Sequence, residues 1–92
     1  MQNRFFVWDE ATNEFRLLGY VLSLTPREQQ IARILLEFDY IKAEEMLEQS
    51  QLPLTLKGIP VHIHAINKKA AVISGRKLIL CDRGYYHMIL AM

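Results

Sequence analysis

The chain of 92 residues lacks the features that mark secreted and membrane proteins. Cys81 is its only cysteine, so an internal disulfide bond is excluded and a reducing cytoplasm is the expected setting. No apolar run approaches the roughly 20 residues that a membrane-spanning helix needs. The N-terminus also lacks the basic-then-apolar layout of a signal peptide. We therefore expect a cytoplasmic domain without membrane contact.

The groups that carry catalysis or hold metals are equally scarce. No nucleophile–base pair and no glycine-rich phosphate loop is visible, so we expect no enzymatic activity. His62, His64, Cys81 and His87 are the side chains that could suggest a zinc site. Residues two apart on a helix diverge by about 160–200°, so His62 and His64 could share a metal only on a strand. We expect no metal and no other cofactor, and we expect Cys81 to be a core thiol.

The sequence has ample hydrophobic residues and an uneven distribution of charge. Hydrophobic residues make up 51% of the chain, which is too many for a disordered protein and sufficient for one small domain. Residues 1–56 carry five Lys/Arg and nine Asp/Glu, a net charge of −4, whereas residues 57–92 carry six and one, a net charge of +5. One basic end is typical of a surface that faces a polyanion. The alternative is a chance asymmetry on a solvated surface.

Residues 24–38 predict a central helix. Thr25 and Glu28 have the spacing of a capping box, and Pro26 occupies the first helical position, where its missing N–H is tolerated. Apolar residues then recur at steps of three and four and form one buried stripe. Before this helix, aromatic and β-branched residues predict three short antiparallel strands over 4–8, 15–18 and 21–24, with aromatic side chains that pack on it.

After the central helix, a short helix is predicted over 43–49, a loop with Pro53 over 50–56, and a third helix from 57 or 58 to 73. The third helix has an isoleucine-rich seam on one side and Lys68 on the other. Residues 77–81 and 85–90 then predict a hairpin with Arg83 at its tip. This order indicates one α+β domain, a winged helix-turn-helix. Its parts are N-terminal strands (1–24), a three-helix unit (25–73) and a wing hairpin (74–92).

The sequence resembles the winged-helix effector domain of OmpR/PhoB-type response regulators over nearly its whole length. The matching features are the LTPRE segment after the N-terminal sheet, Val61-His62-Ile63 followed by Lys68-Lys69, and the Arg83-Gly84-Tyr85 turn. LTPREQQIARIL is also similar to the opening of the LuxR-type helix-turn-helix, but that family lacks the leading strands and the hairpin. The resemblance implies a bacterial transcription regulator that inserts its third helix into the major groove of double-stranded DNA. A second copy, a receiver domain and RNA polymerase are further candidate partners. The chain has no room for a receiver, so we expect a fragment or a stand-alone effector.

On this hypothesis nine residues form the DNA-binding surface. Lysines of the third helix would meet phosphates, Val61 and Ala65 could touch a thymine methyl, and His64 and Asn67 could bond base edges. Arg83 would reach the flanking minor groove or its phosphates. The full set of candidates is Lys57, Val61, His62, His64, Ala65, Asn67, Lys68, Lys69 and Arg83.

The third helix also departs from the pattern of the family it resembles. Family members commonly place arginines near its start and after the V-H-I motif, and an acidic residue before that motif. This chain has Lys57, Pro60, Ala65 and Asn67 at those positions. The departures favour an alternative function: a winged-helix module for protein interaction or dimerisation, without sequence-specific DNA binding.

Overall fold

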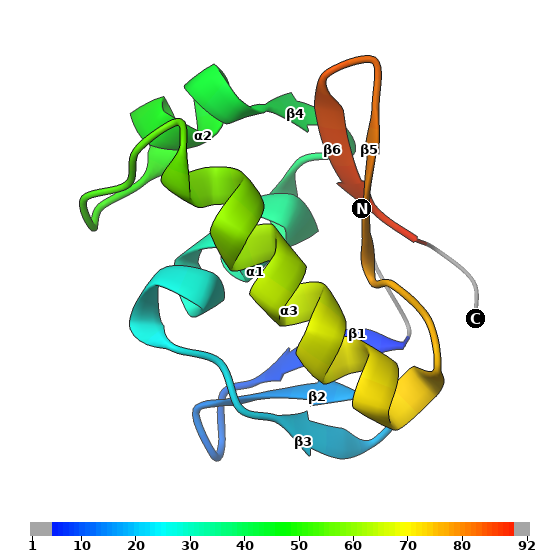
Figure 1. The fold of residues 1–92 in the computed structure, drawn as a ribbon. Helices are drawn as coiled ribbons and strands as arrows, with labels where there is room; N and C mark the ends of the chain where they lie inside the picture. Colours follow the sequence, from blue (N-terminus) through cyan, green and yellow to red (C-terminus); the bar gives the residue numbers. More distant parts are fainter. Residues whose placement is uncertain (1–4, 90–92) are drawn as a thin grey trace.

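The computed structural model describes residues 5–89, which form two three-stranded antiparallel sheets and three helices (Figure 1). Sheet A contains β1 (Phe6–Asp9), β2 (Glu14–Leu17) and β3 (Tyr20–Leu22), in that order. The helices are α1 (Pro26–Glu37), α2 (Ala43–Gln49) and α3 (Gly58–Ser74). Sheet B has the order β4-β6-β5 and contains β4 (Ile41–Lys42), β5 (Ile79–Asp82) and β6 (Tyr85–Met88). The predicted winged helix-turn-helix architecture is confirmed.

Sheet A confirms the three predicted N-terminal strands, with ends that shift by one or two residues. Leu18 and Gly19 both have positive φ angles and form the two-residue turn between β2 and β3, one residue earlier than predicted. Phe6 and Phe15 point inward and stack with ring centroids 5.0 Å apart. Arg4, the predicted first strand residue, lies outside the described residues. Phe6 and Phe15 therefore belong to the core, as expected, whereas Tyr20 on β3 is exposed.

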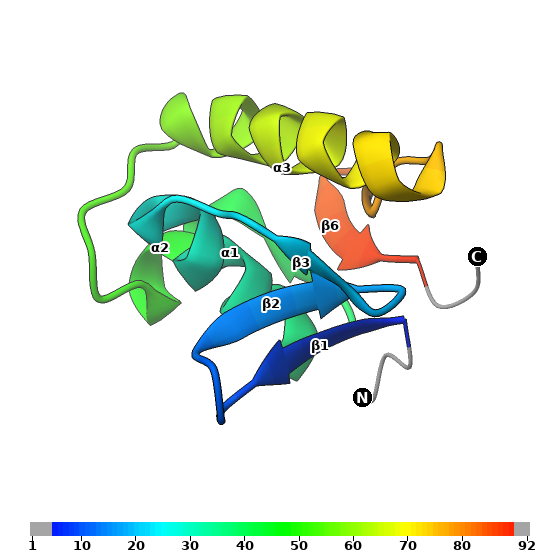
Figure 2. The same cartoon turned by 90° about the horizontal axis from the view of Figure 1, so that it is seen from below.

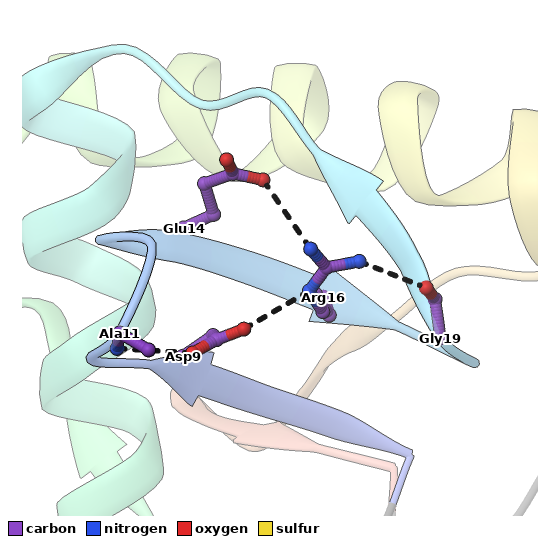
Figure 3. Close-up of polar contacts among 5 residues, drawn as sticks. All are labelled: Asp9, Ala11, Glu14, Arg16 and Gly19. Carbon is purple, nitrogen blue, oxygen red and sulfur yellow. Dashed lines mark hydrogen bonds and ion pairs between the residues drawn. The ribbon is translucent and has the colours of Figure 1, made fainter.

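The outer face of sheet A holds a local charge cluster centred on Arg16 (Figure 3). The Arg16 guanidinium lies 3.2 Å from a carboxylate oxygen of Asp9 and 3.9 Å from one of Glu14. It also donates a hydrogen bond of 3.2 Å to the carbonyl oxygen of Gly19. Because two carboxylates surround its single positive charge, Arg16 does not give this face a basic character.

Helix α1 begins with the predicted capping box. The Glu28 backbone N–H donates to Thr25 Oγ1 at 3.3 Å, and the Thr25 backbone N–H donates to Glu28 Oε1 at 3.0 Å. These bonds satisfy two of the helix's free N–H groups. The apolar stripe of α1 is buried, with Ile31 0% exposed and Leu35 4% exposed. The start and the inward face of α1 are thus both set by local sequence.

Sheet B contains a strand that the sequence did not predict. Ile41 and Lys42 form β4, which pairs with β6 through Ile41↔Tyr86 and Lys42↔Tyr85. Two residues carry no alternation of their own, so only their long-range pairing with the hairpin makes them a strand. The predicted second hairpin strand, 85–90, ends at Met88 in the structure, and Leu90 lies outside the described residues.

The prediction that Cys81 is a core thiol is wrong. The Cys81 side chain is exposed, whereas Ile79, two residues earlier on the same strand, is 2% exposed. Cys81 lies next to the turn of the hairpin on β5, an edge strand of sheet B, and the core does not reach it there. The apolar residues around Cys81 predict a buried strand, but they do not show at which residue of that strand burial ends.

Helix α3 packs its isoleucine seam against α1 and sheet A, and it forms one edge of the molecule (Figure 2). Ile59, Ile63, Ile66 and Ala70 are buried on its inner side. In Figure 2 no other helix or strand of the described chain lies over its outer side. No helix among residues 5–89 combines the length and apolarity needed to cross a membrane.

Candidate nucleic-acid interface

One face of α3 is open to solvent and forms a narrow stripe. At 3.6 residues per turn its members lie within an arc of about 100°. Val61 is 66% exposed and Val72 is 86% exposed, while Ala65 is half-buried between them. We call this surface the outer stripe; it comprises Lys57, Val61, His64, Ala65, Lys68 and Val72.

Asn67 is not part of the outer stripe, although it was a candidate for base contacts. Its Nδ2 donates to the carbonyl oxygen of Ile79 at 2.9 Å. Its Oδ1 accepts from the backbone N–H groups of Leu78 and Ile79, at 2.9 and 2.8 Å. The Asn67 amide therefore connects α3 to the start of β5, and it is not available to a base edge.

Lys69 is likewise engaged inside the protein. Its Nζ lies 2.6 Å from Glu28 Oε1, the same oxygen that closes the capping box of α1. Glu28 is 4% exposed, so a carboxylate that the sequence marks only as a helix cap is the partner of an interhelical ion pair. In the structure the ammonium group of Lys69 is therefore paired with a carboxylate, unlike those lysines of α3 that point to solvent. Sequence reasoning missed the pair because its partners are 41 residues apart.

The pKa of Glu28 reflects this arrangement. Burial by itself raises the pKa of the Glu28 carboxyl. Hydrogen bonds from Lys69 and the Thr25 backbone, with the electrostatic influence of Lys69 and His62, outweigh burial and hold the pKa of Glu28 below its ordinary value. His62 is half-buried on the flank of α3 that faces Glu28, so it too lies off the outer stripe.

Arg83 occupies the tip of the β5–β6 hairpin, as predicted, and it is exposed. Arg83 and Gly84 are the two central residues of the turn, and both have positive φ angles, 54° and 84°. This is the type I′ geometry that suits a two-residue hairpin and favours asparagine or glycine. An arginine here is conformationally unfavourable, so the turn holds a charged side chain at some cost in stability.

The structure thus divides the nine candidates into two groups. An outward group comprises Lys57, Val61, His64, Ala65, Lys68 and Arg83; an inward group comprises His62, Asn67 and Lys69. His62 and His64 lie on different sides of a helix, so the arrangement in which they could share a metal does not occur. Within residues 5–89 no three metal-ligating side chains are grouped to hold an ion.

Comparison with known proteins gives structural matches alone. No family model matches the sequence, and no curated protein sequence matches it significantly. A chain from a family of streptococcal redox sensors that evolved from two-component response regulators superposes with a TM-score of 0.78 at 20% identity. The match covers 98% of this chain and 42% of that protein, so the present chain spans less than half of its length.

A second solved structure matches over its full length. It is the DNA-binding domain of the response regulator AdeR, crystallised in complex with an intercistronic region. The TM-score is 0.77 at 16% identity, and the match covers 98% of both chains. Because the match covers nearly the whole chain, it includes both sheets, the three helices and the hairpin. The chain therefore has the winged-helix fold of response-regulator DNA-binding domains.

Proposed function

We propose that this domain binds double-stranded DNA, with the outer stripe of α3 in the major groove and the β5–β6 hairpin on the flanking groove or backbone, and that it acts in transcription regulation. The observation that carries the proposal is the uncovered α3 face with two exposed lysines, beside a hairpin that holds Arg83 at its tip. The AdeR neighbour was solved with DNA, which supports the same use of this fold. B-DNA's major groove, about 12 Å wide, admits an α-helix.

The contacts with phosphates can be tested by salt dependence. Lys57→Ala together with Lys68→Ala should flatten the slope of log affinity against log salt by about 2 units, because each lysine releases about one counterion. Affinity for a fixed duplex, measured by fluorescence anisotropy at 50 to 200 mM salt, gives the slope directly. Lys68→Gln alone should change it by about 1 unit.

Arg33→Gln is the matched control for charge. Arg33 is exposed on α1, where its guanidinium lies 4.1 Å from the centre of the Trp8 ring. Its loss changes the net charge as much as Lys68→Gln does and should leave the salt slope unaltered. Equal effects of the two variants would show that overall charge, and not the outer stripe, determines binding.

If Arg83 contacts DNA, replacing it should raise the stability of the domain and lower its affinity for duplex DNA. Arg83→Asn relieves an unfavourable φ angle and should raise the free energy of unfolding by about 0.5–1 kcal/mol. The same variant removes the charge at the hairpin tip and should weaken duplex binding. Urea denaturation and duplex titration measure the two effects separately.

Leu18→Asn serves as its control, because Leu18 holds the equivalent position in the β2–β3 turn, with φ 52°. It should give a similar gain in stability and leave DNA affinity unchanged. Unchanged duplex affinity in Arg83→Asn would exclude the hairpin tip from the interface.

A second candidate function is a protein-interaction or dimerisation module. The observation in its favour is that Val61 and Val72 are exposed on α3, where regulators that read DNA by hydrogen bonds need polar groups. This alternative predicts a molar mass that rises with protein concentration and no retention on duplex DNA at low salt. Light scattering and DNA retention on one preparation distinguish the two functions.

A further inference from the structure

We infer that α3 reads the C5-methyl group of pyrimidines in the major groove, so that the domain selects duplexes that place thymine or 5-methylcytosine against Val61 and Ala65. The inference rests on the proposed function, because it names the DNA feature that the outer stripe recognises. The inference depends on which side chains of α3 remain exposed to a ligand once the protein has folded.

The outer stripe has few side chains that read bases by hydrogen bonds. Guanine is commonly read by a bidentate arginine or lysine, and adenine by a bidentate asparagine or glutamine. The outer stripe contains no arginine, asparagine or glutamine, and its two lysines, Lys57 and Lys68, flank Val61 and Ala65. Asn67, the nearest amide on α3, makes three hydrogen bonds to the backbone of Leu78 and Ile79. His64 is the remaining polar side chain on the stripe besides the two lysines.

The two lysines of the stripe are spaced for phosphates. Lys57 and Lys68 are eleven residues apart, which corresponds to about 16 Å along a helix axis. Val61 and Ala65 lie between the two lysines, so each end of this apolar part of the stripe carries a positive charge that can meet a phosphate.

The exposed apolar side chains fit one feature of the floor of the major groove. Val61 is 66% exposed although it belongs to a residue type that is usually buried. Thymine displays a C5-methyl group in the major groove, and small apolar side chains contact it. A methyl group on C5 of cytosine occupies the equivalent place on its base pair. Valine and alanine methyls against either group would exclude water from an apolar contact.

The test uses duplexes that differ only in this methyl group. Tight-binding duplexes are first enriched from a random-sequence pool, and the recovered sequences are then synthesised with thymine or with uracil. We expect affinity to fall about fourfold for each contacted methyl that is lost, the factor that corresponds to exposing one buried methyl group. Uracil retains the Watson–Crick edge and the O4 acceptor, so the change isolates the methyl group.

A second arm distinguishes the two sources of the methyl group. Duplexes with a cytosine–guanine pair at the contacted positions are compared with and without a methyl group on C5 of the cytosine, and the methyl group should raise affinity by the same factor if any C5-methyl suffices. An effect of the methyl group on thymine alone would overturn the part of the inference that concerns 5-methylcytosine and leave thymine as the recognised base.

Variants of α3 complete the design. Val61→Ser should reduce the preference for thymine over uracil by about fourfold, the factor of one methyl contact, because Ala65 keeps its own contact. Val72→Ser should discriminate as the native protein does. Both valines are exposed, so thermal denaturation of the two variants should match the native protein. Val72 lies three turns further along α3, outside the N-terminal part that contacts bases in helix-turn-helix proteins.

The inference and the proposed function fail in different ways. Duplex binding with a normal salt slope but equal affinity for thymine and uracil would overturn the inference and leave DNA binding intact. Absence of duplex binding at 50 mM salt would overturn both.

Discussion

Asn67→Ala should lower the free energy of unfolding by about 3 kcal/mol, because it removes three hydrogen bonds, each with a net contribution of about 0.5–1.5 kcal/mol. Those bonds join α3 to the backbone of Leu78 and Ile79, whose side chains are 0% and 2% exposed. Alanine leaves two backbone N–H groups without an acceptor at the point where the chain enters β5. Urea denaturation gives the free energy, and amide hydrogen exchange should show faster exchange at Leu78 and Ile79.

Asn67→Asp provides a graded comparison. A carboxylate can still accept from both N–H groups, but it cannot donate to the Ile79 carbonyl oxygen and it repels that oxygen. Its stability should therefore lie between those of the native protein and Asn67→Ala. If the free energy of unfolding of Asn67→Ala is within 0.5 kcal/mol of the native value, the Asn67 amide does not hold the hairpin against α3.

Lys69→Met should lower the free energy of unfolding by about 1–2 kcal/mol at pH 7. Removing one partner of a fully buried ion pair costs about 3–5 kcal/mol. The Lys69 side chain is 39% exposed, so water screens part of this interaction and we expect a smaller loss. The measurement is urea denaturation, with Lys68→Met as the control, because Lys68 is the exposed neighbour on the outer stripe.

The destabilisation should depend on pH with a definite sign. In the native protein the pKa of Glu28 is lowered, so its contribution to stability is present above the ordinary glutamate pKa, about 4.3, and is lost as the pH falls through the folded-state value. Without Lys69 the pKa of Glu28 should rise relative to the native protein, because only the Thr25 hydrogen bond and the interaction with His62 still oppose burial. The difference between Lys69→Met and the native protein should therefore shrink as the pH falls from 7 to below the ordinary glutamate pKa of about 4.3. A difference that stays constant over this range would assign the loss to packing of the lysine side chain.

Together these contacts give α3 three distinct sides. Its seam is buried, one flank is joined to α1 through Lys69 and Glu28, and the other flank is joined to β5 through Asn67. Both flanks hold polar side chains that look, in the sequence, like members of a basic or hydrogen-bonding surface. The outer stripe is what remains free, and it is less polar than the sequence suggested. This is why the inference about methyl recognition depends on the structure.

Elements with strong local signals could be predicted from the sequence. The capping box of Thr25 and Glu28, the boundaries of α2 and the seam of α3 each depend on residues within a few positions of one another. The hairpin with Arg83 at its tip belongs to the same group. Predictions failed for β4 and for Cys81, where the outcome depends on pairing with distant strands or on the position of the core edge.

The sequence by itself determined the winged-helix architecture, because periodicity, caps and turns are encoded over one or two helical turns of chain. It also placed Val61, His64, Ala65, Lys68 and Val72 on the solvent side of α3, since residues on one helix face share a fixed angular spacing. Only the tertiary structure decided that Lys69 and Asn67 face inward. Their partners, Glu28 and the backbone of Leu78 and Ile79, are far along the chain and come within hydrogen-bond distance only when the helices and the hairpin pack together.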